Sequence, residues 1–184
     1  SRDWSSDVCS SDLGGVSASE ERVSADLRQA KVLAEAGRYK ESVALLKSYE
    51  PTDRSEEFQI NLMVGKIYLK LDRPARALGF FESAYDQNID SLEASMGVAA
   101  SQIQLGDFKK AKEFLNIASS IDKNSAEPIL YGALIQYRSG NISDANTQIQ
   151  QLIRLNPDSV DAAIVQAKFL QLTGDNVNAL KSIQ

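Results

Sequence analysis

A turn residue is followed five positions later by a small residue at five places along this chain. The five pairs are Gly37 and Ser42, Asp72 and Ala77, Gly106 and Ala111, Gly140 and Ala145, and Gly174 and Ala179. The successive turn residues are separated by 35, 34, 34 and 34 residues. Such a regular period predicts a stack of similar supersecondary units, each of which buries its apolar face against its neighbours.

The first thirteen residues are set apart from this pattern. Residues 3–13 read DWSSDVCSSDL, which resembles the in-frame translation of a sequencing adapter, so we exclude residues 1–13 from the fold prediction and expect them to be disordered or irregular. This segment holds the single Trp, Trp4, and the single Cys, Cys9. Cysteine usage therefore does not indicate a redox compartment. A native signal sequence would lie upstream, so both a cytoplasmic and a periplasmic location stay open.

The charge balance bears on the class of partner. The whole chain has 20 Lys and Arg against 25 Asp and Glu, a net charge of −5. This mild acidity argues against nucleic acid, which proteins bind through cationic patches that release counterions from phosphate. No apolar run approaches the roughly 20 residues of a membrane-spanning helix. We expect a protein or peptide partner, no nucleic acid, and no membrane-spanning segment in this fragment.

Apolar residues recur at three- and four-residue spacing on both sides of each turn residue, which is typical of helices. In the third unit, Met96 and Ile103 precede Gly106, and Leu115 follows it. The prolines, which a helix interior does not tolerate, all fall at expected helix ends; they are Pro51, Pro74, Pro128 and Pro157. We expect an all-α fold of about five helix-turn-helix units, the last one incomplete. After a lead-in at 14–22, the predicted units are 23–57, 58–91, 92–125, 126–159 and 160–184.

Two rows of side chains are set by their distance from the turn residue. The residue seven positions before it is small and the residue nine positions after it is large, which predicts that a knob on one helix fills a hole on the other. The small row is Ala30, Gly65, Ala99, Ala133 and Ala167, and the large row is Leu46, Phe81, Leu115, Ile149 and Ile183. An acid three residues after a capping side chain predicts a helix start. These pairs are Ser17 with Glu20, Asp53 with Glu56, Asp90 with Glu93, and Asn124 with Glu127.

The pattern resembles the tetratricopeptide repeat, a helix-turn-helix unit of 34 residues. The second unit carries the resemblance most clearly, through Val64 and Gly65, Tyr68, Ala77, Phe81 and Ala84. The resemblance covers Val23 to Gln184, with departures at Asn61, Gln102 and Gln136. It implies a right-handed α-solenoid, of a style found in bacterial proteins, that holds a peptide or partner segment in the concave groove formed by the first helices.

The resemblance places candidate partner-binding residues on the first helices. Their apolar rows could grip apolar anchors of a partner, or they could pack each first helix against its neighbour. Lys31 and Lys66 could anchor an acidic group, although charges on a helix face are usually a solvated surface. The candidate groove residues are Leu27, Lys31, Leu62, Lys66, Leu69, Met96, Ile103, Leu130, Leu134, Tyr137, Ile164 and Lys168.

Two related functions do not fit these rows. Family members that clamp the C-terminal carboxylate of chaperone peptides use Lys and Asn, but here Leu27, Leu62 and Met96 fill the position of one of those lysines. The pentatricopeptide repeat has nearly the same period but reads RNA, and its groove is expected to be basic and polar. Neither a chaperone cofactor of that kind nor an RNA reader is expected.

The residue inventory does not support catalysis. The chain has no His, and its Cys is in the excluded segment, which removes the commonest general base and zinc ligands. Asp158 and Asp161 are close together, but they stand at an expected helix start, where capping is their role. We expect no enzyme activity, no metal and no cofactor. Besides a scaffold, two alternatives stay open: an arm of a larger bacterial envelope or exopolysaccharide-assembly protein, and the targeting arm of a transferase whose catalytic domain is missing.

Overall fold

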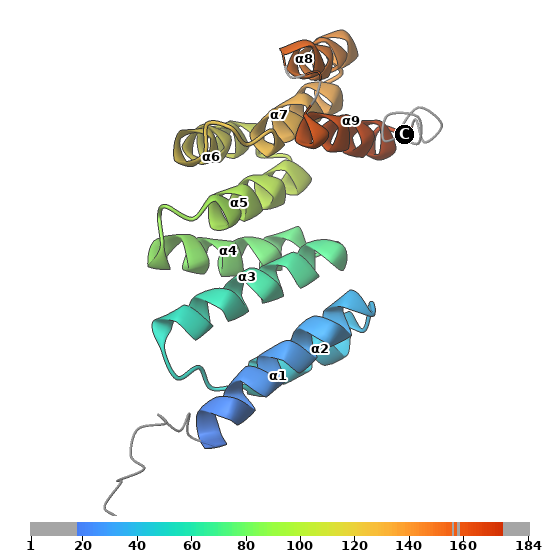
Figure 1. Cartoon of the computed structure of the whole chain (residues 1–184). Coiled ribbons are helices and arrows are strands. Elements are labelled where there is room, and N and C mark those ends of the chain that lie inside the picture. Colours follow the sequence, from blue (N-terminus) through green and yellow to red (C-terminus); the bar gives the residue numbers. More distant parts are fainter. Residues whose placement is uncertain (1–17, 156, 158, 175–184) are drawn as a thin grey trace, which may run out of the picture. The chain divides into compact units, whose positions relative to one another are not determined.

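The structure is a computed structural model that describes residues 18–155, 157 and 159–174, with side chains from residue 25 onward. Within these residues the secondary structure consists of α-helices joined by short turns and loops, as predicted (Figure 1). The helices are α1 (Ala18–Glu35), α2 (Tyr39–Ser48), α3 (Arg54–Lys70), α4 (Pro74–Gln87), α5 (Leu92–Leu105), α6 (Phe108–Ile121), α7 (Glu127–Arg138), α8 (Ile142–Leu155) and α9 (Val160–Leu172).

The described residues divide into two compact units, the first ending at Pro51 and the second beginning at Thr52. In the first unit α1 packs on α2, with Leu33 and Leu46 buried between them. The buried hydroxyl of Ser42 donates a hydrogen bond to the backbone carbonyl of Ala30 at 2.6 Å. Ser42 therefore fills the position that Ala occupies in the other repeats and uses its extra oxygen to join the two helices.

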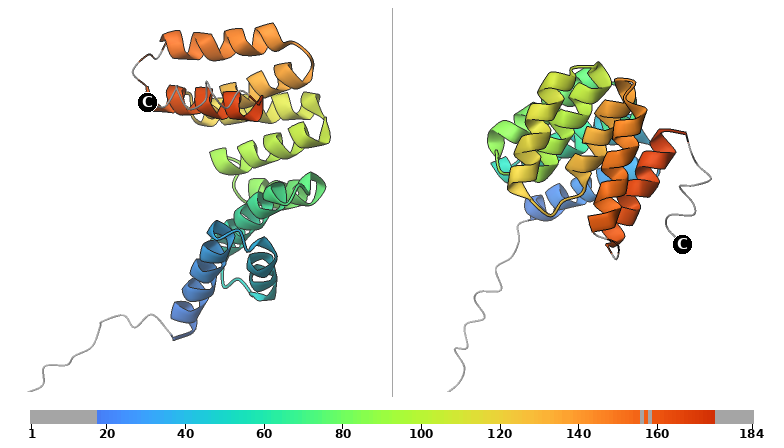
Figure 2. Two further views of the ribbon diagram at one scale, coloured as in Figure 1. Left: turned by 90° about the vertical axis from the view of Figure 1, so that its right-hand side faces the viewer. Right: turned by 90° about the horizontal axis from the view of Figure 1, so that it is seen from above.

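The second unit is a stack of helix pairs. Helices α3 to α9 follow one another in chain order, and each packs on the next (Figure 1). The first helices also contact one another directly, α3 with α5, α5 with α7, and α7 with α9. Figure 2 gives two further views of these helices. This arrangement is the all-α stack of helix-turn-helix units that the period predicted.

The predicted turn residues end the first helices in a left-handed backbone conformation. Gly106 has φ 83° and Asp72 has φ 55°. Asp72 is the non-glycine residue with positive φ among the described residues. The residue after the turn residue donates its N–H to a carbonyl five positions earlier, Asp107 to Gln102 at 2.9 Å and Arg73 to Tyr68 at 2.9 Å. These bonds satisfy carbonyls at the helix end that have no partner within the helix.

The two predicted core rows are confirmed at every described position except Ala167. Phe81, from the large row, is 1% exposed, and Gly65, from the small row, lies against its ring. Ala30, Ala99, Ala133, Leu46, Leu115 and Ile149 are also buried. Ala167 is partly exposed, and Ile183 lies outside the described residues. Ala99 shares a buried cluster with Leu115, and Ala133 shares one with Ile149, so a small and a large residue are packed into the core of successive repeats.

The helix starts confirm the predicted cap at Asp53 and correct two others. Asp53 accepts the N–H of Glu56 at 2.9 Å. The cap of α5 is Ser91 rather than Asp90, and its hydroxyl accepts from Ala94 at 3.1 Å. Asp90 was a wrong prediction because it lies one residue too early, in the turn that precedes the helix.

Helix α7 begins without the predicted side-chain cap at Asn124. Its cap residue is Ala126, which makes no side-chain hydrogen bond. The N–H of Asn124 instead donates to the carboxylate of Asp122 at 2.9 Å. Pro128, in the first turn of α7, has no N–H and so reduces the number of donors that need a cap. Ser17 lies outside the described residues.

The helix bounds differ from the predicted units at two starts. Helix α1 begins at Ala18, inside the expected lead-in, and α3 begins at Arg54, before the predicted boundary at residue 58. The cap at Asp53 explains the second difference. The predicted boundary at residue 58 followed from the period of the turn residues, whereas the helix itself begins directly after its cap. The excluded residues 1–13 and the second helix expected in the last unit lie outside the described residues.

Candidate functional site

Five of the twelve predicted groove residues are buried inside the second unit. Their side chains are between 3% and 9% exposed and fill the core between successive helices. They are Leu62, Met96, Ile103, Leu130 and Leu134. For these five, the burial favours the packing interpretation over the partner-binding one, because they present little surface to a partner.

The other predicted residues keep accessible surface. In the second unit, Leu69 and Tyr137 are partly exposed, Ile164 is 40% exposed, and Lys66 and Lys168 are exposed. In the first unit, Leu27 is partly exposed and Lys31 is exposed. We call the surface that carries Leu69, Lys66, Tyr137, Ile164 and Lys168 the first-helix face of residues 52–174.

Two ion pairs connect neighbouring first helices on this face. The ammonium of Lys66 on α3 contacts the carboxylate of Glu93 on α5. The ammonium of Lys168 on α9 lies 3.7 Å from the carboxylate of Glu127 on α7. The sequence placed these lysines six residues before the turn and these glutamates thirteen before it, but it did not predict that they pair across repeats. All four side chains remain about half exposed.

The C-terminal ends of the first helices are tied together by hydrogen bonds from α7. Nη1 of Arg138 donates to the backbone carbonyl of Ile103, at the end of α5, at 3.0 Å. The hydroxyl of Tyr137 donates to the carbonyl of Thr173, just after α9, at 3.3 Å. Arg138 was not among the predicted residues, because a single Arg on an expected helix end carries no periodic signal.

Tyr131, on α7, is partly buried against the core of the second unit. Burial raises the pKa of its phenol above the usual 10.0, and the nearby carboxylate of Glu127 raises it further. Burial disfavours the charged phenolate, and a like charge adds to that penalty. Tyr131 therefore stays a neutral hydrogen-bonding group at any physiological pH.

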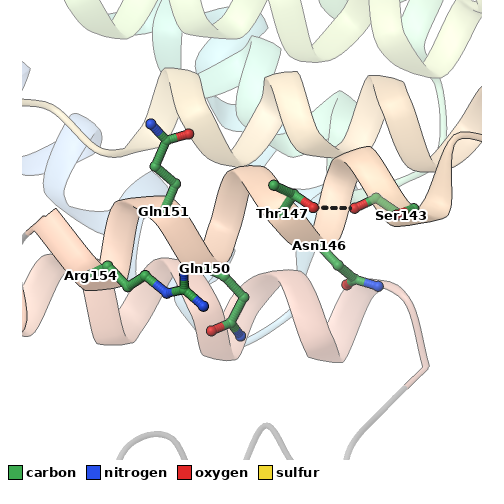
Figure 3. Close-up of a pocket in the computed structure, with 6 residues that line it drawn as sticks. All are labelled: Ser143, Asn146, Thr147, Gln150, Gln151 and Arg154. Atoms are coloured by element: carbon green, nitrogen blue, oxygen red, sulfur yellow. Dashed lines mark hydrogen bonds between the residues drawn. The ribbon is translucent and has the colours of Figure 1, made fainter.

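A shallow depression lies along one side of α8 (Figure 3). Its described lining consists of polar side chains spaced at three and four residues, so they form one stripe of the helix. They are Ser143, Asn146, Thr147, Gln150, Gln151 and Arg154. The hydroxyl of Thr147 is occupied by a bond to the carbonyl of Ser143 at 2.8 Å. This stripe can offer hydrogen bonds, but it includes no carboxylate that could act with Arg154.

A second depression, of about 310 Å³, lies between α6, α7 and α8. Lys112 and Asn116 line it from α6, Gln136 from α7 and Gln148 from α8. Gln148 lies close to Gly132 of α7, where an added Cβ would be 3.3 Å from Nε2 of Gln148.

No group of three or more Cys, Asp or Glu side chains in the described part of the chain is arranged to hold a metal ion. None of the helices that the structure describes is both long and apolar enough to cross a bilayer.

Comparison with known proteins identifies the family. Two family models, both described as tetratricopeptide repeat, match residues 68–135 and 132–184. The chain matches no curated protein sequence.

Solved structures of the same kind superpose on most of the chain. They include TTC0263, a tetratricopeptide repeat protein of Thermus thermophilus, at a TM-score of 0.65 and 19% identity over 87% of each chain. A tetratricopeptide repeat protein from Parabacteroides merdae superposes with a TM-score of 0.63 and 16% identity, over 89% of this chain and 66% of that one. MamA superposes with a TM-score of 0.59 and 16% identity, over 84% of this chain and 90% of that one. The period, the buried small and large rows and the family models agree, and the chain is a tetratricopeptide repeat protein.

Proposed function

We propose that this tetratricopeptide repeat protein acts as an interaction scaffold that binds an extended or helical segment of a partner protein along the first-helix face. Repeat arrays of this family are in general protein-interaction scaffolds, and the fold is typical of proteins without catalytic activity of their own. The proposal concerns which face the partner segment contacts and which side chains hold it.

The observation that carries the proposal is the pair of half-exposed ion pairs, Lys66 with Glu93 and Lys168 with Glu127. An exposed ion pair contributes only about 0–1 kcal/mol to stability. A charged group of a partner can therefore replace one member of either pair at little cost to the fold. The two pairs lie on successive first helices, α3 with α5 and α7 with α9, so one partner segment can reach both.

The apolar part of the face is restricted to side chains that keep accessible surface. Leu69, Tyr137 and Ile164 are candidates to contact apolar side chains of the partner. Leu62 and Leu130 are not, because they are 7% and 3% exposed. The partner segment is therefore expected to combine charged residues of both signs with a few apolar ones.

Site-specific photo-crosslinking in an extract of the native host tests this proposal. A photoreactive amino acid is placed at Leu69 or at Ile164 on the face, and at Ile142 or Leu155 as controls, since these two are also exposed apolar residues but belong to α8. The expected result is that one partner is crosslinked from both face positions and from neither control position.

Charge reversal on the face then tests the role of the ion pairs. Lys66→Glu combined with Lys168→Glu should reduce capture of that partner about tenfold or more, equivalent to about 1.4 kcal/mol. Reversal at Lys123, which is exposed and lies on the α6–α7 loop, is the matched control. Equal capture by the double variant and wild type, with circular dichroism confirming that both are folded, contradicts the proposal.

A further inference from the structure

The second unit segregates its charges between two opposite edges. The turn edge consists of the residues around the turns inside each repeat, 70–76, 104–112 and 138–144. The loop edge consists of the residues that begin α3 and connect successive repeats, 52–57, 86–93 and 121–127. In Figure 1 the α3–α4 and α5–α6 turns lie on the right of the stack, and the α4–α5 loop lies on the left.

The turn edge is basic although the whole chain has a net charge of −5. Its three segments carry seven cations against Asp72, Asp107 and Asp144, and all seven cations are exposed. These cations are Lys70, Arg73, Arg76, Lys109, Lys110, Lys112 and Arg138. One of them, Lys110, lies 3.7 Å from the carboxylate of Asp107. The other six cations are distributed over all three segments, so the excess of positive charge is spread over successive turns.

The loop edge has the opposite sign. Its segments carry eight acids against Arg54 and Lys123. The acids are Asp53, Glu56, Glu57, Asp86, Asp90, Glu93, Asp122 and Glu127. Glu93 and Glu127 take part in the ion pairs of the first-helix face. Asp53 and Asp122 accept backbone N–H groups.

From these two edges we infer that the protein associates with a second copy of itself, the basic turn edge of one copy lying on the acidic loop edge of the other. Two physical arguments support this choice of partner.

The first argument is the separation of the edges. Helices α4, α5 and α6 each have 14 residues, which at 1.5 Å per residue is about 21 Å. At physiological ionic strength the Debye length is about 8 Å. A molecule that approaches one edge therefore responds mainly to the charge of that edge, and the overall net charge of the chain does not prevent the contact.

The second argument is the spacing of the charges. Each repeat adds one turn to the turn edge and one loop to the loop edge, so both edges advance by the same step along the stack. The bond from Arg138 to the carbonyl of Ile103, at the ends of α7 and α5, places successive turns side by side. A second copy offers acidic groups at the matching interval, which a nucleic acid with a phosphate at every nucleotide does not.

The resulting contact joins different surfaces on the two copies. Such a heterologous contact leaves one free edge at each end of a pair, so it generates rows of increasing length unless the rotation closes a ring. The contact shares Glu93 and Glu127 with the ion pairs of the first-helix face, but the accessible apolar residues of that face, Leu69, Tyr137 and Ile164, belong to neither edge. The association would present several partner-binding faces in one assembly.

Sedimentation velocity of the full chain at increasing concentration tests the proposal. In about 0.05 M salt the weight-average mass should rise above the monomer value of 20.1 kDa, and in about 0.5 M salt it should return to that value because screening shortens the range of the attraction. A mass that stays at 20.1 kDa in low salt, with or without binding of a short single-stranded DNA, overturns the proposal. So does an association that salt does not weaken.

A charge-swap experiment identifies the surfaces. Lys70→Glu with Lys109→Glu removes the net positive charge of the turn edge, and Asp86→Lys with Asp90→Lys makes the α4–α5 loop basic. Each double variant alone should associate more weakly than wild type, whereas an equimolar mixture should recover association, because the new lysines of one variant can face the new glutamates of the other. Both variants keep a net negative charge, since each shifts the value of −5 by four, so a general attraction between oppositely charged proteins does not explain recovery.

The matched control is Glu82→Lys with Glu113→Lys, which changes the net charge equally at exposed positions outside both edges. This control variant should associate as wild type does. Circular dichroism and thermal melting confirm that each variant is folded. Loss of association in the control, undiminished association of either edge variant alone, or failure of the mixture to recover association would each show that the edges are not the contact surfaces.

Discussion

The ring of Phe81 lies against the backbone of Gly97, and a Cβ added to Gly97 would be 2.2 Å from Cδ1 of the ring. Gly65 also lies against this ring, where an added Cβ would be 2.9 Å from Cε2 and Cζ. Phe81 on α4 thus packs into two gaps, one on α3 in its own repeat and one on α5 in the next. This contact holds two successive repeats together.

Gly97→Ala should therefore destabilise the fold. A ring that is 1% exposed has no space to move aside, and overpacking of this kind costs about 1–3 kcal/mol. Gly79→Ala is the matched control, because Gly79 lies in α4 with nothing within 4 Å of an added Cβ. Since Ala is the better helix former, this control should stabilise by about 0.5–1 kcal/mol. Urea denaturation of the two variants measures both effects, and equal stabilities would contradict the assigned contact.

Sequence reasoning could predict one half of this contact but not the other. Gly65 belongs to a row of small residues that recurs in every repeat, so its contact with the large residue of its own repeat is periodic. Gly97 stands nine residues before its turn, where the other repeats have Arg28, Met63, Tyr131 and Val165. A contact that occurs once leaves no periodic trace, and only the packed structure reveals it.

The residues ten positions before each turn residue allow a direct test of whether this row packs in the core or lines a partner-binding groove. Leu130 is 3% exposed in the middle of the stack, whereas Ile164, at the same position of the next repeat, is 40% exposed. Leu130→Asp should destabilise by several kcal/mol, because it buries a charge without a partner and removes apolar contacts; costs of about 2–5 kcal/mol arise from the apolar loss alone. Ile164→Asp should cost less than about 1 kcal/mol. Thermal melting distinguishes these outcomes, and similar costs at both positions would show that the row is not core.

This row also illustrates why the candidate site could be predicted only in part. The sequence placed Leu62, Met96 and Leu130 on the first helices, and they lie there. Whether such a row faces solvent or a neighbouring helix depends on how deeply successive helices interlock, which the period does not determine. The pairing of Lys66 with Glu93 was missed for the same reason, since it joins charges from different repeats.

The turn residues give a prediction about backbone strain. Asp72 has φ 55° where the other repeats have glycine, and left-handed conformation costs a residue with a Cβ roughly 1 kcal/mol. Asp72→Gly should therefore leave stability unchanged or raise it by up to about 1 kcal/mol. Gly106→Ala, at φ 83° with nothing within 4 Å of the added Cβ, should lower stability by about 1 kcal/mol through strain alone. Chemical denaturation that gave both substitutions the same sign would contradict this account.

The ion pairs of the first-helix face should contribute little to stability. Lys66→Ala and Lys168→Ala each remove one exposed pair, and each should change the free energy of unfolding by less than about 1 kcal/mol. The melting temperature should move by no more than a few degrees, and it should move less in high salt, where exposed pairs are screened. A larger fall would show that the pairs hold the repeats together, and it would weaken their proposed role in partner binding.

The raised pKa of Tyr131 predicts how the stability of the protein changes at alkaline pH. Burial, assisted by Glu127, raises the pKa of its phenol above 10.0, so the unfolded chain loses this proton at a lower pH than the folded chain does. The contribution of the neutral phenol is fully present below the unfolded pKa of about 10, and it is lost as the pH rises through the folded pKa. Wild type should therefore lose more stability than Tyr131→Phe between about pH 9 and pH 11, measured by denaturation at each pH. Glu127→Gln should reduce this difference only slightly, because burial is the larger cause of the raised pKa. Identical pH profiles for wild type and Tyr131→Phe would mean that the folded chain does not raise the pKa of the phenol.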